Sequence, residues 1–271
     1  MLKVVVVVEH HLPPTTPKEQ AKEQTTAMTD YTPTSHKAIN QVHRLKERAN
    51  YDSEAINSIL DNNMLAHVGF TLPPGIAEED DWPFVMPMCY GRIEDIVYIH
   101  GYVSGRMMKA LSSDNLPKVC ITVSQVDALI VAMSPFHNSF NYYSAVIFGH
   151  GRLVTDPEEK SLALEAITNQ PFRHADRWND SRLPNKIDLQ STKVIAVRIE
   201  KASAKHRIGG VNDDLKETKD EEMCKKYYSG IVPCKMVYGT PVASSYNQAP
   251  TPSYLEPEEL NKERVMYNVK E

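Results

Sequence analysis

The sequence predicts a mainly β protein with flanking helices, arranged as an antiparallel barrel. Three observations predict it: short segments rich in Val, Ile, Tyr and Phe recur at close spacing, turn-forming residues bound several of them, and few helical segments lie between them. Several segments also alternate between buried and exposed types of residue, as half-buried strands do. The expected strands are residues 64–70, 84–90, 96–100, 118–123, 128–133, 142–154 and 192–200.

Helical patterns interrupt these strands at three places. The expected helices are residues 53–61, 105–112 and 157–168. The first follows Asp52, a residue type that favours the N-cap position, and carries apolar residues on one face. The start of the third is well marked, because Asp156 can act as N-cap, Pro157 suits the first helical position and Glu159 completes a capping box.

Composition divides the chain into one folded domain and two polar ends. Residues 10–36 are rich in Thr, Pro, Gln and Lys and bury too little apolar surface to fold, so residues 1–37 are expected to form a disordered leader. Residues 239–271 have a similar character and are expected to form a flexible tail. The domain between them, residues 38–238, shows no internal repeat of the solenoid or propeller kind.

Charge, cysteine content and hydropathy exclude several classes of function. The 271 residues include 30 Lys plus Arg against 35 Asp plus Glu, a net charge of -5, and no long basic segment, so nucleic-acid binding is not expected. The four cysteines form no CxxC pair, which argues against a zinc site and for a reducing compartment. The apolar run at residues 4–8 is far shorter than the roughly 20 residues of a spanning helix, and no cleavage site follows it. We therefore expect a cytoplasmic protein without a membrane segment.

The segment 96–111 predicts a small phosphate site. A strand ends near His100, and Ser104 can cap a short helix whose free backbone N–H groups attract an anion. Arg106 and Lys109 are three residues apart and therefore lie on one side of that helix. Serine caps and helical Arg or Lys residues are also common in purely structural helices, so the pattern alone leaves both interpretations open.

Other sequence patterns for catalysis are absent or incomplete. The chain has no GxSxG, P-loop or HExxH motif. The Gly-His-Gly sequence at 149–151 lacks the third glycine of a dinucleotide fingerprint and lies inside an expected strand, where it predicts a bulge or bend. His100 is a candidate ligand or base, but a histidine at the end of a strand is more often a hydrogen-bonded structural residue, and the same holds for His67 and His137. No close histidine pair predicts a metal site.

The polar and aromatic segment 134–144 joins two expected strands. It is too long for a tight hairpin and rich in hydrogen-bonding side chains, a composition typical of binding loops. Asn and Ser residues also make local turns in ordinary surface loops. The sequence leaves these two interpretations open.

A series of short motifs lies along residues 44–235. They are Arg48-Ala49-Asn50-Tyr51-Asp52, His67-Val68-Gly69-Phe70, Pro87-Met88-Cys89-Tyr90, Tyr98-Ile99-His100-Gly101, Ser104-Gly105-Arg106, Phe136-His137-Asn138-Ser139, Asn141-Tyr142-Tyr143-Ser144 and the residues from Asp156 to Lys160. In the order and spacing of these motifs, the chain resembles the flavin-nucleotide-binding, pyridoxamine-oxidase-like family, which includes nitroimidazole-resistance-type proteins.

The resemblance implies a six-stranded antiparallel split β-barrel that forms a homodimer, with FMN in a cleft between the subunits. The cofactor-binding residues that it implies are Pro87, Met88, Cys89 and Tyr90 beside the flavin ring, Ile99, His100, Gly101, Ser104, Gly105, Arg106 and Lys109 around the ribityl chain and phosphate, and Asn141, Tyr142 and Ser144. Relatives commonly carry Arg where this chain has Tyr143, so the resemblance also implies fewer contacts to the phosphate than usual.

The function implied by the resemblance is that of an FMN-dependent oxidoreductase of the flavin-reductase type, acting on a small substrate with NAD(P)H as a candidate electron donor. The lack of a catalytic motif agrees with this, because the flavin itself carries the electrons. Both tryptophans, Trp82 and Trp178, lie outside the C-terminal tail, so the signature of true vitamin B6 oxidases is missing. The alternatives are a non-catalytic flavin- or haem-binding storage or sensor protein, and a split barrel with an empty site.

Overall fold

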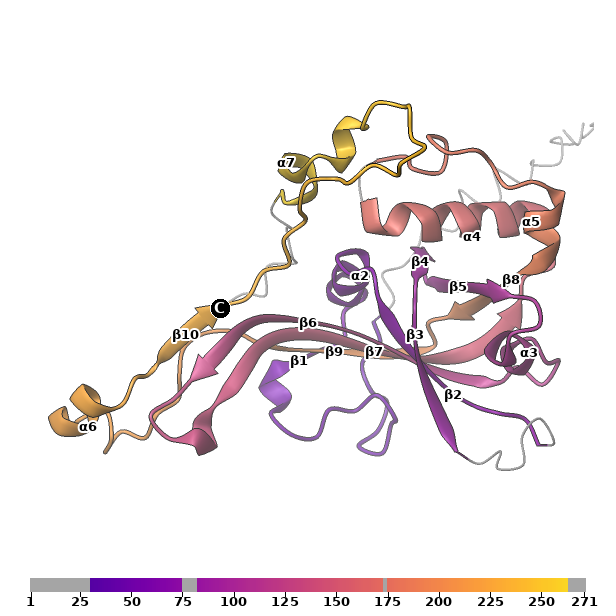
Figure 1. Ribbon diagram of the computed structural model, residues 1–271. Helices are drawn as coiled ribbons and strands as arrows, with labels where there is room; N and C mark the ends of the chain where they lie inside the picture. The colour runs from indigo at the N-terminus through magenta and orange to yellow at the C-terminus, as the bar shows by residue number, and fades with distance from the viewer. Residues whose placement is uncertain (1–29, 75–81, 173–174, 263–271) are drawn as a thin grey trace, which may run out of the picture.

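The computed structural model describes residues 30–74, 82–172 and 175–262, which form one antiparallel sheet with helices packed against it (Figure 1). Within these ranges the sheet has ten strands. They are β1 (Ala49–Asn50), β2 (Ala66–Thr71), β3 (Pro83–Met88), β4 (Tyr90–Ile93), β5 (Ile96–Tyr102), β6 (Lys118–Val131), β7 (Ser139–Leu153), β8 (Thr192–Arg198), β9 (Lys201–Arg207) and β10 (Gly230–Pro233).

The strand count corrects the expectation of six strands, whereas the mainly β architecture with flanking helices is confirmed. The pattern of β-branched residues does not predict β9, because its sequence is KASAKHR. Apart from Arg207, its buried positions are small residues, among them Ala202 and Ala204, which belong to the larger core. This segment forms a strand because it pairs with β7, although its own sequence has low β propensity.

The hydrogen-bonded path through the sheet begins and ends on strands that are adjacent in sequence. The path runs β3-β2-β6-β7-β8-β5-β4, with β9 paired to β7 and β10 paired to β6 beside it. Cys89 alone separates the end of β3 at Met88 from the start of β4 at Tyr90. The two ends of the path therefore meet, so the sheet curls around its core, although no described ladder joins β3 to β4.

β6 and β7 form a long hairpin that projects to one side of the molecule (Figure 1). The sequence predicts two separate strands where the structure has the single strand β6. The pairing with β7 shifts register between Val126 and Ala128, at the polar residue Asp127. The ladder with β7 continues on both sides of this shift, so the two expected strands form one.

β7 changes its partner along its length. It pairs with β9 through Phe148 and with β8 from Gly151 onward. Of the expected bulge or bend at residues 149–151, the bulge is wrong, because Gly149 and His150 pair with β6 without a shift of register. A side chain at Gly149 would overlap the carbonyl oxygen of Arg198 at the end of β8. The glycine is therefore required by the close approach of two strands.

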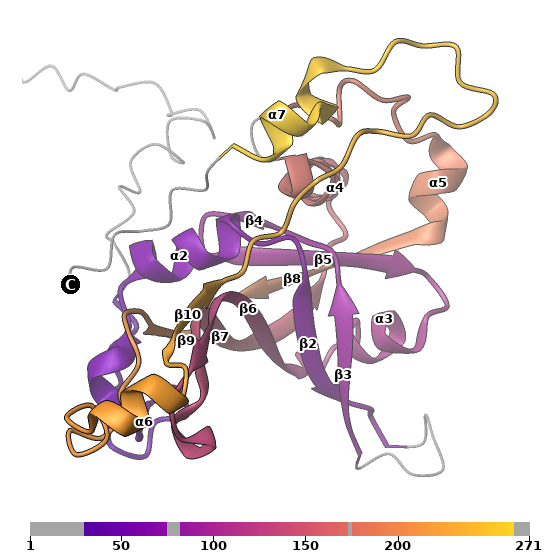
Figure 2. The same ribbon diagram turned by 60° about the vertical axis from the view of Figure 1, so that its left-hand side comes forward.

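The helices lie on the outside of the curled sheet (Figures 1 and 2). They are α2 (Ser53–Asp61), α3 (Arg106–Leu111), α4 (Pro157–Asn169), α5 (Lys186–Ser191), α6 (Glu221–Lys226) and α7 (Pro257–Leu260), with 3-10 turns η1 (Lys46–Arg48), η2 (Pro135–His137), η3 (Gln170–Phe172) and η4 (Ser253–Leu255). The N-cap of α4 is confirmed, since the Asp156 carboxylate accepts a 2.7 Å hydrogen bond from the Glu159 N–H. The Glu159 carboxylate accepts hydrogen bonds from Tyr98 and Arg152, which fix the start of α4 to the sheet.

Two apolar clusters form the core. The larger lies inside the curled sheet and includes Ile56 and Leu60 of α2 and Met108 and Leu111 of α3, all nearly inaccessible to solvent. The smaller lies between α4 and strands β5 and β8. Tyr31 belongs to the larger cluster, so the packed chain includes part of the segment expected to be a disordered leader. The other residues of that leader, 1–29, lie outside the described ranges.

The chain after β10 runs back past α4 (Figures 1 and 2). The hydroxyl of Tyr254 donates a hydrogen bond to Asp180, and its ring packs edge-on against Phe172 with ring centroids 6.1 Å apart. The described part of the expected flexible tail is thus attached to the domain by specific contacts. In the described ranges, every helix is too short or too polar to cross a lipid bilayer.

Candidate cofactor site

Three cationic side chains lie on or beside α3. Arg106 and Lys109 are exposed on this helix, as the phosphate-site prediction requires. Lys193 of β8 joins them, since its ammonium group donates a 2.8 Å hydrogen bond to the hydroxyl of Ser112 at the end of α3. The Arg106 guanidinium lies 5.7 Å from the ring centroid of Phe84 on β3, a cation–π contact that orients it. All three positive charges therefore belong to or contact this one short helix.

The start of α3 differs from the sequence prediction. Gly105 is the N-cap, and neither it nor Ser104 makes a side-chain capping hydrogen bond. The exposed Ser104 precedes the cap, and the helix itself has six residues. The attraction for an anion at this corner therefore comes mainly from the charges of Arg106 and Lys109, with little from the helix dipole.

The predicted flavin-ring residues lie where β3 passes into β4. Pro87 is exposed, Met88 is half-buried and the thiol of Cys89 is exposed. Tyr90, in contrast, is fully buried in the core, and its hydroxyl donates to backbone oxygens at the end of α2. Because its side chain is enclosed by the core, Tyr90 can meet a ligand only through its backbone.

β5 carries the next three predicted residues on alternating faces. Ile99 is buried in the larger core, and Gly101 lies so close to α3 that a Cβ there would be 3.0 Å from the Cγ of Met108. His100 lies on the opposite face, paired with Val194 across the sheet. Its Nδ1 atom is buried and has no hydrogen-bond partner in the described part of the chain. That nitrogen is available to a ligand.

The remaining predicted residues lie elsewhere in the chain's fold. Asn141 is buried near the tip of the β6–β7 hairpin, where its side chain accepts a 2.6 Å hydrogen bond from Arg207 and donates to Gly209. Asn141 and Gly151, which packs on α3, are ten positions apart along β7, roughly 30 Å at 3.3 Å per residue. Asn141, Tyr142 and Ser144 therefore do not join the α3 corner within one chain (Figure 1).

Sequence patterns missed three features near these residues. Lys193 lies in an apolar strand, and Arg207 ends the unpredicted β9, so neither stands out as a ligand-binding cation. Arg207 places a guanidinium beside Asn141 and is the cross-strand partner of Tyr142. The third feature is a cleft of about 710 Å³ between α4, α5 and β8. It is mostly apolar, and its rim includes Lys160, Lys186 and Lys193.

We expect acid to destabilise the protein through two histidines. Burial lowers the pKa of His100 below its usual 6.5, and burial together with the nearby Arg48 lowers the pKa of His206. Below pH 6.5 the unfolded chain therefore binds more protons than the folded one, so the free energy of unfolding falls as the pH falls. Urea unfolding on either side of pH 6.5 measures this slope. His100→Asn is expected to flatten it, and an unchanged slope would contradict the assignment to His100.

Comparison with known proteins places the chain in a family. The model of the pyridoxamine 5′-phosphate oxidase family matches residues 52–206, more than half of the chain. A comparison with curated proteins found no match. Among solved structures, the chain is similar to the flavocytochrome Anf3 from Azotobacter vinelandii, with 29% identity, coverage of 80% of this chain and 94% of that one, and a TM-score of 0.67. It is also similar to the FAD and heme binding protein from Mycobacterium smegmatis, with 25% identity, coverage of 77% and 95%, and a TM-score of 0.65. The chain belongs to the pyridoxamine 5′-phosphate oxidase family.

Proposed function

We propose that this protein binds a flavin nucleotide and works as a flavin-dependent oxidoreductase on a small substrate. The observation that carries the proposal is the group of Arg106, Lys109 and Lys193 around α3. A flavin nucleotide has a phosphate at the end of its ribityl chain, and Arg and Lys side chains provide the charge-assisted hydrogen bonds that hold phosphate. Both similar structures are of flavin proteins by name, a flavocytochrome and an FAD-binding protein.

The flavin supplies the electron-transfer chemistry, and the chain supplies binding and orientation. In this proposal Arg106, Lys109 and Lys193 hold the phosphate end, while the exposed edge at Pro87–Cys89 lies along the ring. FMN is the flavin that the sequence resemblance implies. The M. smegmatis relative favours FAD as the second candidate, and the cleft that Lys193 also lines could receive the additional adenylate group. The two cofactors share the phosphate position.

We further propose that two copies of the chain form the complete site. The predicted residues divide into one group at the α3 corner and one near the hairpin tip, so a single chain does not bring them together. Apolar side chains are exposed along β3 and the hairpin, where a partner would cover them. They include Val85 (65% exposed), Val126 (46%) and Phe140 (53%). Solvent-exposed apolar surface of this kind commonly marks an interface.

A haem group beside the flavin is a second candidate function. Both similar structures combine the two cofactors in their names. His100 has the chemistry of an axial ligand, because burial keeps its imidazole neutral and its Nδ1 has no hydrogen-bond partner in the described residues. The apolar cleft lies nearby, since Val154 in its wall donates its backbone N–H to Val194, the cross-strand partner of His100.

A visible absorption spectrum of the purified full-length protein tests these proposals together. We expect flavin bands, their bleaching by NADH or NADPH in the absence of oxygen, and a dimeric mass in sedimentation of the same sample. Chromatography of the released cofactor distinguishes FMN from FAD. A Soret band would support the haem candidate, and its absence after growth with haem supplied would rule it out. A colourless protein that takes up no added flavin would contradict the main proposal.

A further inference from the structure

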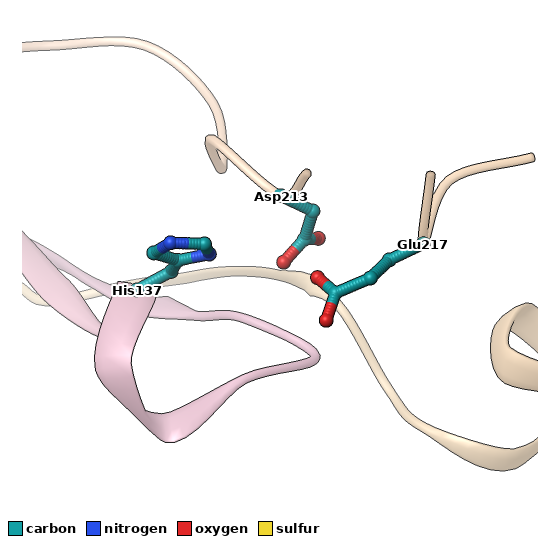
Figure 3. A group of neighbouring side chains, drawn as sticks. All are labelled: His137, Asp213 and Glu217. Atoms are coloured by element: carbon teal, nitrogen blue, oxygen red, sulfur yellow. The ribbon is translucent and has the colours of Figure 1, made fainter. Parts of the chain in front are cut away.

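Three side chains with metal-binding chemistry meet at the tip of the β6–β7 hairpin, far along the hairpin from the α3 corner. They are His137, Asp213 and Glu217, and one potential ligand atom of each lies within 4.8 Å of the other two. Figure 3 shows the imidazole and the two carboxylates turned toward a common point. His137 ends η2 in the hairpin, whereas Asp213 and Glu217 belong to the segment between β9 and α6. The tertiary structure brings these two segments together.

Two of the three side chains have buried atoms that the protein leaves unsatisfied. Nδ1 of His137 and Oε2 of Glu217 are buried and have no hydrogen-bond partner among the described residues. Leaving a buried polar atom unpaired costs about 1–3 kcal/mol, and more when the group is charged. In the described ranges, no Lys or Arg forms an ion pair with Asp213 or Glu217. A cation between the three groups would satisfy the buried atoms and offset the repulsion between the carboxylates.

The third ligand, Asp213, is held in place by neighbours. The backbone N–H of Met133 donates a 2.9 Å hydrogen bond to Oδ1, and the hydroxyl of Ser229 donates to Oδ2. Each carboxylate oxygen accepts more than one bond, so both remain able to bind a cation. Outer hydrogen bonds of this kind orient the ligands of metal sites. Asp213 directly precedes a turn of helical type, in which the Thr218 N–H donates to the Asp214 carbonyl oxygen, and Glu217 lies within that turn.

We propose that His137, Asp213 and Glu217 form a binding site for a divalent transition-metal ion, with Zn²⁺ as the probe. One imidazole nitrogen and two carboxylate oxygens are ligands that Zn²⁺ accepts, whereas Mg²⁺ and Ca²⁺ prefer oxygen ligands throughout. Zn–N and Zn–O bonds of 2.0–2.2 Å place tetrahedral ligands about 3.4 Å apart. The ligand atoms lie within 4.8 Å of one another, so each pair needs to close by about 1.4 Å at most, and a water molecule would complete the coordination.

The consequence of binding would be structural. The ion would hold the 208–229 segment against the β6–β7 hairpin, whose Asn141 accepts a hydrogen bond from Arg207 at the end of β9. This site does not depend on the flavin proposal, because none of its ligands lies at the α3 corner. Its failure and that of the proposed function are separately measurable.

Calorimetric titration with Zn²⁺ tests the site in the untagged full-length protein after treatment with a chelator. We expect a high-affinity site, one per chain, that is weakened at least about 100-fold in Glu217→Gln and in His137→Ala, since loss of even an outer partner costs 10–100-fold. Asp214→Asn is the matched control. It removes one carboxylate from the adjacent, exposed position, and we expect it to retain the site. Asp213 is left unchanged, because its hydrogen bonds to Met133 and Ser229 contribute to folding.

Thermal unfolding supplies a second measurement that does not rely on heats of binding. Zn²⁺ should raise the unfolding temperature of the wild type and of Asp214→Asn but not of Glu217→Gln, because a ligand stabilises only the fold that binds it. Equal zinc binding by the wild type and the His137→Ala, Glu217→Gln double variant would overturn the proposal. So would loss of binding in Asp214→Asn as large as in Glu217→Gln, since the effect would then be one of general charge.

Discussion

Replacing Arg106 and Lys109 together with alanine is expected to weaken flavin binding at least about 100-fold, because each charge-assisted hydrogen bond to a phosphate contributes about 1.5–3 kcal/mol. Both side chains are exposed, so the double variant should fold. The cation–π contact of Arg106 with Phe84 contributes only about 0.5–1 kcal/mol to the free energy of unfolding, because Arg106 is exposed to solvent. Fluorescence titration of the apoprotein with FMN and with FAD measures the effect.

The control for this variant removes the same two charges elsewhere. Lys37→Ala with Lys201→Ala changes two exposed lysines outside the α3 corner and should leave the affinity close to that of the wild type. Raising the salt concentration should weaken binding in the wild type more than in the Arg106, Lys109 double variant, since salt screens exposed charges. If the double variant binds flavin as well as the wild type does, the phosphate lies at another place in the fold.

Gly149→Ala is expected to lower the free energy of unfolding by about 3 kcal/mol or more, at the upper end of overpacking effects. The new Cβ would overlap the Arg198 carbonyl oxygen and would lie 3.1 Å from the side chain of Val197. A backbone oxygen cannot move aside as a flexible side chain can. Relief therefore requires β7 and β8 to separate at the point where β7 changes partner. Urea unfolding followed by circular dichroism measures the loss.

The matched control for Gly149→Ala is Gly239→Ala, where a Cβ meets no atom within 4 Å. This change should be neutral or slightly stabilising, because alanine lowers the entropy of the unfolded chain. Equal stability of the two variants would show that β7 and β8 do not approach as closely as described. If Gly149→Ala is as stable as the wild type but binds flavin with a different affinity, Gly149 influences the cofactor site and not the stability of the sheet.

The sequence by itself determined the local features of this protein. Alternating apolar segments predicted most strands, and the pairs Asp52 with α2 and Asp156 with α4 predicted two helix starts, because caps and strand patterns depend on neighbours in sequence. The same holds for the cations of α3, since residues three apart share one side of a helix. The motifs along the chain also identified the family.

Only the tertiary structure decided which distant residues meet. β9 is a strand because β7 provides its partner, although its own sequence has little β propensity. Lys193 bonds to Ser112 at the end of α3, Arg207 bonds to Asn141, and His137 meets Asp213 and Glu217 across long separations in sequence. Tyr90 belongs to a family motif yet points into the core, where its hydroxyl bonds to backbone oxygens of Leu60 and Asn63, far away in sequence. Periodicity describes one segment at a time, whereas a site depends on how the sheet curls and which segments it brings together.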